Sequence, residues 1–348
     1  MNYEQYQHEH QNIFLVDMRK ELNHYFSELM DSALQKYLRL KKKIGIIVNK
    51  KWYSQGCICK KCGYIPQCKR CSVSISYHKQ KNGEMIGLCH ICKTQYAYPS
   101  QCPQCHADGV SFFGVGTQQL SEILEKQYHT SSLIIETETV NSPNKIKKIF
   151  DLVRQTSPSL IIGTSLLSEP LYFYPFDLLI FINADIGLNI PDYTANENNF
   201  LLLYETLKKH QTKNIIIQTF NPENYSIRSA CKMDYTGFYE QENLFRQQMK
   251  YPPFAELCIL LYKDEIEDRL YAKVNKLYQE LLYLAERYHF TDLEIYSTPP
   301  LIYKTFGKYR YNIILKGEQV RNFMEIVISR LPIQERGFKI HRDAESIV

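Results

Sequence analysis

Two stretches decide the fold of this chain: CKKCGYIPQCKRC at residues 59–71 and CHICKTQYAYPSQCPQC at residues 89–105. Together they contain four Cys-x-x-Cys pairs, which are Cys59/Cys62, Cys68/Cys71, Cys89/Cys92 and Cys102/Cys105. Each pair places two thiolates on one tight turn, which is half of a tetrahedral zinc shell. Four pairs therefore predict two structural four-cysteine sites that hold two zinc ions and leave no open position for a catalytic water.

The spacing alone does not fix which pairs share a zinc ion. We favour a nested arrangement because it clamps the insertion at its two ends, where the chain must return to its main domain. The outer pairs then form site 1 (Cys59, Cys62, Cys102, Cys105), and the inner pairs form site 2 (Cys68, Cys71, Cys89, Cys92). Disulfide or redox chemistry is the alternative, and regularly spaced pairs in a cytosolic protein argue against it.

Length, composition and charge limit the other interpretations. A chain of 348 residues with 44% hydrophobic residues suggests two or three domains, each able to bury a core. No stretch approaches the ~20 apolar residues of a membrane-spanning helix, and the opening MNYEQYQHEHQNIF has no signal-peptide pattern. We therefore expect a cytoplasmic, nucleoid-associated protein without a membrane partner. The formal charge of +5 would fall to about +1 with eight thiolates and two zinc ions, so an argument for nucleic acid needs local patches.

Short apolar runs alternate with helical segments on either side of the cysteine block. The expected helices are residues 20–43, 117–128, 144–154 and 197–210, and the expected strands are residues 44–48, 110–113, 133–135, 160–162, 178–182 and 215–219. This alternation is typical of a parallel sheet with helices on its faces. The block interrupts the alternation after its first strand, so we interpret it as an insertion within an α/β domain.

The order of elements changes towards the C-terminus. A helix over residues 226–250 is expected to end at Tyr251-Pro252-Pro253. The elements expected beyond it are strand 257–262, helix 265–288, strands 293–296 and 310–315, helix 318–330 and strand 338–341. This β-α-β-β-α-β order predicts a small ferredoxin-like α+β domain. The predicted division is residues 1–56 and 109–250 for the α/β domain, 57–108 for the zinc insertion and 251–348 for the C-terminal domain.

These segments resemble the PriA family of replication-restart helicases (primosomal protein N-prime). The cysteine block resembles the zinc-binding region of that family, and VDMRKEL (16–22) resembles the start of its second helicase lobe. Four further segments resemble successive landmarks: FFGVGTQQLSEIL (112–124), LIIGTSLL (160–167), IIIQTFNPENYSI (215–227) and YTGFYEQENLFRQQMKYPPF (235–254). The resemblance covers about residues 14 to 345.

The resemblance implies a specific organisation and specific partners. The α/β domain would be the second RecA-like helicase lobe, with the zinc module inserted in it and its cysteines paired in the nested way. Forked or single-stranded DNA and primosome or replication proteins are the implied partners. The resemblance also implies that the C-terminal domain, residues 251–348, is a DNA-binding domain that contacts branched DNA.

The chain departs from the family at the positions that carry ATP chemistry. It has no G-x-x-x-x-G-K-[ST] loop to cradle phosphate, and no span before Val16 is long enough for the first ATP-binding lobe or the N-terminal DNA-binding domain. The nearest match to the loop is Gly307-Lys308-Tyr309, which has the wrong successor. Glu169-Pro170 stands where the family has Lys-Gly, and Tyr204–His210 lacks the arginine finger.

An arginine finger contributes a factor on the order of a thousand or more to the rate of phosphoryl transfer. Lys208 and Lys209 lie at that position, and a lysine pair cannot supply the planar bidentate fork of arginine. We therefore predict that the chain holds no complete ATP site and alone does not hydrolyse ATP.

Two basic segments are candidates for DNA contact. The run from Tyr303 to Tyr311 interleaves cations with aromatic rings, which neutralise phosphates and stack on bases respectively. It also resembles the family's K-x-x-G-x-Y-R-W turn, and we select Lys304, Lys308, Tyr309 and Arg310 from it. A solvated hairpin with ordinary core aromatics is the alternative. The second segment is Lys69 and Arg70, which flank a predicted zinc knuckle and either meet phosphates or offset thiolate charge.

The leading hypothesis is a degenerate PriA-like replication-restart protein that binds zinc and branched or single-stranded DNA but has no motor activity of its own. One alternative is half of a split ATP-dependent 3′–5′ helicase, whose ATP-binding lobe is a separate polypeptide. An ATPase that arises only on mixing the two would favour it. The other alternative is a protein-interaction remnant that no longer binds DNA, which weak, salt-insensitive DNA affinity would favour.

Overall fold

The computed structural model describes residues 2–344 apart from 24, 49–55, 60–63, 65, 71–74, 80–83, 90–93, 109, 114–116, 136–142, 158, 165–173, 186, 189 and 332–336. The chain forms two compact units. Unit 1 consists of residues 1–54, 114–190 and 195–241, and unit 2 consists of residues 55–113, 191–194 and 242–348. No helix among the described residues is both long and apolar enough to cross a membrane.

Unit 1 is built on a seven-stranded, mostly parallel sheet. Its strand order is β1-β2-β12-β11-β3-β10-β9, and only the edge strand β1 runs antiparallel to its neighbour. The strands are β1 (Tyr3–His8), β2 (Gln11–Asp17), β3 (Ile44–Ile47), β9 (Leu133–Ile135), β10 (Leu160–Gly163), β11 (Leu178–Phe181) and β12 (Asn214–Thr219). Strands β3, β10 and β11 are buried at every position, as their continuous apolar runs predict for a sheet covered on both faces.

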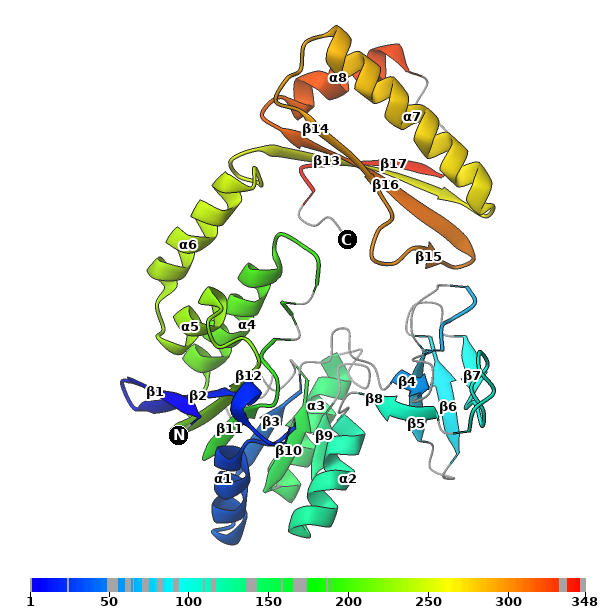
Figure 1. Cartoon of the computed structure of the whole chain (residues 1–348). Helices are drawn as coiled ribbons and strands as arrows, with labels where there is room; N and C mark the ends of the chain where they lie inside the picture. Colours follow the sequence, from blue (N-terminus) through cyan, green and yellow to red (C-terminus); the bar gives the residue numbers. More distant parts are fainter. Residues whose placement is uncertain are drawn as a thin grey trace. The chain divides into compact units, whose positions relative to one another are not determined.

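Helices cover both faces of this sheet (Figure 1). Side chains of α1 (Glu28–Arg39) and α2 (Thr117–Tyr128) pack in one core cluster, where Met30, Leu34 and Leu120 are fully buried. Side chains of α3 (Pro143–Thr156), α4 (Ala195–Lys209) and α5 (Tyr225–Cys231) pack in the other. The predicted α/β alternation is therefore confirmed, and α2 begins and ends at its predicted residues.

Three predictions for individual elements were wrong. The helix predicted over residues 20–43 is a short 3₁₀ turn (Met18–Lys20) followed by α1, because Ser27 caps α1 by accepting a hydrogen bond from Met30 N–H. The helix predicted over residues 226–250 is two helices, α5 and α6 (Tyr235–Gln248), separated at Met233, whose φ is +55°. Strand β8 (Val110–Phe113) was expected in the α/β alternation and instead pairs only with β4 (Gly56–Cys59).

The cysteine block in unit 2 forms small antiparallel sheets. Strands β4 and β8 pair antiparallel at its two ends, so Cys59 lies opposite Val110 and Gly56 opposite Phe113. Between them, β5 (Ser76–Lys79), β6 (Met85–Leu88) and β7 (Gln95–Ala97) form a three-stranded meander. The β4–β8 pair closes the block at its base, which is the geometry of an insertion.

The C-terminal part of unit 2 has the predicted β-α-β-β-α-β order, with one additional two-residue strand. Its strand order is β14-β16-β13-β17, and β15 pairs with β16. The elements are β13 (Glu256–Asp264), α7 (Glu267–Arg287), β14 (Glu294–Thr298), β15 (Lys304–Thr305), β16 (Lys308–Gly317), α8 (Val320–Arg330) and β17 (Phe338–Arg342). Helices α7 and α8 lie on one face of the sheet and share a buried core with it (Figure 1).

Candidate zinc centres and nucleic-acid interface

Three of the four cysteine pairs lie in loops that a backbone hydrogen bond closes at the base. Cys89 N–H donates to Thr94 O at 2.9 Å, and Cys102 N–H donates to Ala107 O at 3.0 Å, the same offset around a Cys-x-x-Cys pair. A wider loop around Cys68 and Cys71 closes through Ile75 N–H and Pro66 O at 3.0 Å. Closed turns of this kind suit a structural zinc site, which needs two sulfur ligands on one tight turn.

Two cysteines of site 2 share one buried cluster. Cys68 is 1% exposed, Cys89 is fully buried, and both pack with Ile75 and Tyr77. The hydroxyl of Tyr96 donates to Cys68 Sγ at 3.1 Å and accepts from Lys69 N–H at 3.1 Å. A hydrogen bond of this kind to the sulfur helps to orient a cysteine that binds a metal ion.

Site 1 is described less completely. Cys102 is buried, Cys105 is half-buried, and only the backbone of Cys59 is described. Cys62, Cys71 and Cys92 lie outside the described residues. The residues that the structure does describe contain no group of three potential ligands, since they include only two cysteine side chains of each predicted site. The sulfur donors, their closed turns and the burial of Cys68, Cys89 and Cys102 all fit zinc.

The basic-aromatic segment forms a two-residue hairpin. Lys304 pairs with Tyr309 and Thr305 with Lys308, so Phe306 and Gly307 make the turn. Both have positive φ, +50° and +84°, as a type I′ turn requires. Phe306 is 60% exposed, a bulky ring held in the left-handed region at the hairpin tip. No role for Phe306 was predicted from the sequence. The Phe-Gly dipeptide between two strand-like segments is the sequence feature that could have indicated this turn.

One hydrogen bond joins the two candidate DNA-contact segments. Gly307 N–H, at the hairpin tip, donates to the carbonyl oxygen of Arg70 at 3.0 Å. The exposed side chains of Lys69, Arg70 and Lys308 therefore lie on segments that meet. We refer to the knuckle 67–70 and the hairpin 304–309 together as the knuckle–hairpin surface.

The four residues selected from the hairpin have different surroundings. Lys308 is exposed, with Nζ 3.7 Å from a Glu265 carboxylate oxygen. Lys304 Nζ lies 4.0 Å from the centroid of the Tyr309 ring, and that ring also packs on the C-terminal core. Arg310 is half-buried, and its Nη1 lies 3.4 Å from Ile302 O. Lys308 therefore has the most accessible side chain of these four residues.

The position expected for an arginine finger lies in the last turn of α4. Lys209 pairs with Glu205 at 3.3 Å, and Lys208 Nζ lies 5.7 Å from the Tyr204 ring centroid. His210 is buried, with its ring against Phe176. The Glu169-Pro170 departure lies outside the described residues.

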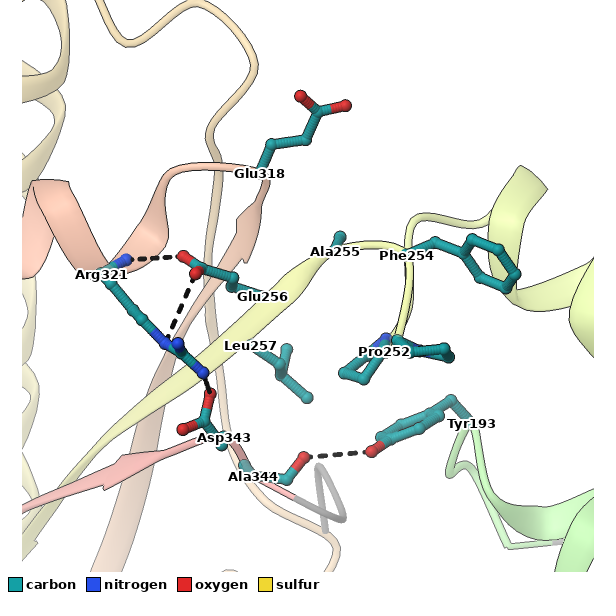
Figure 2. Close-up of a pocket in the computed structure, with 11 residues that line it drawn as sticks. Tyr193, Pro252, Phe254, Ala255, Glu256, Leu257, Glu318, Arg321, Asp343 and Ala344 are labelled. Carbon is teal, nitrogen blue, oxygen red and sulfur yellow. Dashed lines mark hydrogen bonds and ion pairs between the residues drawn. The ribbon is translucent and has the colours of Figure 1, made fainter.

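A cavity of about 520 Å³ in unit 2 is not suited to nucleic acid. Its lining carries three carboxylates, and its one guanidinium, Arg321, pairs with Glu256 at 3.4 Å and Asp343 at 2.9 Å (Figure 2). The Tyr193 hydroxyl donates to Ala344 O across the same cavity. An acidic lining with a neutralised arginine repels phosphate.

Known proteins give this geometry a context, although no family model matches the chain. The replication restart protein PriA of Bacillus subtilis is 29% identical over 318 residues, which is 88% of this chain and 38% of that protein. PriA of Borreliella burgdorferi is 30% identical over 87% of this chain and 46% of its own length, and PriA of Synechocystis is 30% identical over 87% and 37%. The chain thus spans less than half the length of these relatives. This chain is a homologue of the PriA replication restart proteins.

Proposed function

We propose that the chain acts in replication restart as a zinc-stabilised module that binds branched or single-stranded DNA through the knuckle–hairpin surface. The hydrogen bond from Gly307 N–H to Arg70 O carries this proposal, because it joins two basic segments that are far apart in the sequence. Phosphates would contact Lys69, Arg70, Lys304 and Lys308, and the exposed Phe306 ring would stack on an unpaired base. The proposed partners besides DNA are primosome or replication proteins.

The proposed zinc ions are structural and hold the knuckle that presents the cations. Site 1 is Cys59, Cys62, Cys102 and Cys105, and site 2 is Cys68, Cys71, Cys89 and Cys92. Lys69 and Arg70 lie between two ligands of site 2, so a bound ion would fix their backbone. The proposal includes the domain division given above, with residues 1–56 and 109–250 as a RecA-like helicase lobe. It also includes the absence of ATP hydrolysis by this chain alone.

The test is equilibrium binding to a forked DNA with a single-stranded arm, compared with plain duplex, at two salt concentrations. The variant Lys69→Gln/Lys308→Gln removes one exposed cation from each segment. The control Lys276→Gln/Arg330→Gln removes two exposed cations from α7 and α8. We expect salt-sensitive binding that prefers the fork and is weakened about tenfold only in the first variant. Absence of binding by the folded, zinc-loaded protein would refute the proposal and favour a protein-interaction remnant.

A further inference from the structure

The face of the C-terminal sheet opposite α7 and α8 carries a concentrated set of cations. Side chains alternate between the two faces of a strand, and Tyr262, Tyr309, Tyr311 and Ile340 pack in the core beneath the helices. Their neighbours therefore point to the other face. These neighbours are Lys263 of β13, Lys308 and Arg310 of β16 and Lys339 of β17, which we name the basic sheet face.

The strand register places these cations side by side. Lys263 lies directly opposite Arg310, and Lys339 lies opposite Leu261, two positions along β13 from Lys263. Like charges opposite each other destabilise a sheet. Burial lowers the pKa of Lys263, and Arg310, Lys339 and Lys308 lower it further. Burial also lowers the pKa of Arg310. The fold therefore holds these charges together at a cost to stability.

Among the described residues, three of these four cations lack the counter-ions that other cations of unit 2 have. Lys316 pairs with Glu294 at 3.0 Å and Arg269 pairs with Asp264, but the part of the chain that the structure describes places no carboxylate within 4 Å of the charged atoms of Lys263, Arg310 or Lys339. The Arg310 Nε atom is buried and has no hydrogen-bond partner there. The fourth cation, Lys308, has Nζ 3.7 Å from a Glu265 carboxylate oxygen.

An external anion would satisfy these groups, and their spread indicates its size. The cations lie on three adjacent strands, which span about 10 Å at the usual strand spacing. That distance is wider than one phosphate group and suits a run of phosphates along a nucleic-acid strand, whose charges are about 3.4 Å apart along the helix axis. We propose that the basic sheet face binds the phosphodiester backbone of a nucleic-acid strand, with Lys263, Arg310 and Lys339 as its central contacts.

This inference rests on the proposed function and adds a second contact surface to the knuckle–hairpin surface. Lys263 and Lys339 are the residues to test, because Lys308 belongs to both surfaces and Arg310 is half-buried. Removing charge at Lys263 relieves repulsion, so Lys263→Gln/Lys339→Gln should melt at the same temperature as the wild type or higher. A loss of binding in this variant would then not reflect unfolding.

The experiment measures binding of a labelled oligothymidylate of about 20 nucleotides, and of a duplex, between about 50 and 200 mM salt. For Lys263→Gln/Lys339→Gln we expect weaker binding at low salt and a salt slope that is smaller by about 1.4, or 0.7 for each lost phosphate contact on a single strand. The control Lys276→Gln/Arg330→Gln should keep the wild-type slope. Inorganic phosphate at equal ionic strength should compete no better than chloride.

Each other outcome overturns the inference in a recognisable way. The salt slope of binding could be unchanged in Lys263→Gln/Lys339→Gln but reduced in Lys69→Gln/Lys308→Gln. That result would show that the basic sheet face does not bind DNA, and it would leave the proposed function intact. Strong competition by inorganic phosphate would show that the basic sheet face binds a free anion and not a nucleic-acid strand. No oligonucleotide binding by the wild-type protein removes both proposals.

Discussion

The hydroxyl of Tyr96 donates a 3.1 Å hydrogen bond to the sulfur of Cys68 and accepts one from the backbone of Lys69. Tyr96 belongs to β7, the last strand of the three-stranded meander. Its side chain therefore links the Cys68 turn to that sheet. The contact links a predicted zinc ligand to a predicted DNA contact. The predicted zinc ligand Cys68 and the backbone of Lys69 are thus held by the same hydroxyl.

The first prediction concerns this hydroxyl. Tyr96→Phe keeps the ring and removes both hydrogen bonds, so zinc at site 2 should be held about tenfold more weakly, as for other residues that orient metal ligands. Chelator competition with a colorimetric zinc indicator measures the loss. Tyr64→Phe is the matched control, since the described part of the chain gives the Tyr64 hydroxyl no hydrogen bond. Equal zinc affinity in the two variants and the wild type would show that Tyr96 does not support a metal site.

The second prediction separates nested from consecutive pairing of the cysteines. The zinc-loaded protein should contain two zinc ions, and Cys68→Ser should release one. With nested pairing, Cys71, Cys89 and Cys92 then become reactive towards iodoacetamide, whereas Cys59, Cys62, Cys102 and Cys105 stay protected. Consecutive pairing instead exposes Cys59, Cys62 and Cys71. Mass spectrometry of the labelled peptides distinguishes the two patterns.

Two buried cysteines provide an internal reference for that experiment. Cys231 and Cys258 are 0% and 2% exposed, and burial raises the pKa of each thiol to about 12. Neither forms the reactive thiolate at neutral pH, so both should stay unlabelled until the chain unfolds. Labelling of Cys231 in the Cys68→Ser variant would mean that the substitution has opened unit 1, and the pattern of the other thiols would then say nothing about pairing.

The third prediction is that this chain alone releases no phosphate from ATP in the presence of forked DNA. Lys208 and Lys209 sit at the end of α4, where each contacts a neighbour on its own helix, and neither presents a planar fork. Lys208→Arg/Lys209→Arg should also stay at background, because a helicase ATP site needs a phosphate-cradling loop as well. A fork-stimulated ATPase activity that co-elutes with the purified protein would contradict this prediction.

The fold was predictable where local patterns are strong. The ends of α2 and β9 are at their predicted residues because each is an apolar pattern bounded by polar or turn residues. The N-terminal hairpin of β1 and β2 was missed because Tyr3–His8 is mostly polar and pairs only as an edge strand. The start of α1 was predicted too early because the helical pattern of apolar residues extends upstream of Ser27. In the structure, the hydrogen bond from Met30 N–H to the Ser27 side chain marks where the helix begins.

The candidate site was predictable only in part for a different reason. The cysteine spacing predicts zinc ligands without a structure, because each pair is local in sequence. The hydrogen bond between Gly307 and Arg70, and the register that sets Lys263 opposite Arg310, join residues from separate segments. Such contacts depend on how strands pair, which periodicity does not determine.

The fourth prediction is an acid sensitivity of the C-terminal domain to which the buried carboxylate of Asp264 contributes. Asp264, at the end of β13, is buried and accepts hydrogen bonds from the Arg269 guanidinium and from Ile266 N–H. The Arg269 hydrogen bonds, chiefly, hold the pKa of Asp264 at about 2. An unfolded aspartate has a pKa of about 3.9. The lowered pKa means that Asp264 stabilises the fold above about pH 4, and that this contribution is lost as the pH falls towards 2.

Asp264→Asn should therefore lower the free energy of unfolding at neutral pH by about 1 kcal/mol, a modest value because the Arg269 side chain is half exposed. The difference from the wild type should shrink as the pH falls from about 4 to about 2, where the wild-type carboxyl is protonated too. Urea unfolding followed by circular dichroism at several pH values measures both effects. Asp268→Asn, an exposed position on the first turn of α7, is the control and should track the wild type. A constant difference between Asp264→Asn and the wild type down to pH ~2 would show that packing, rather than the charge on Asp264, stabilises this corner of the sheet.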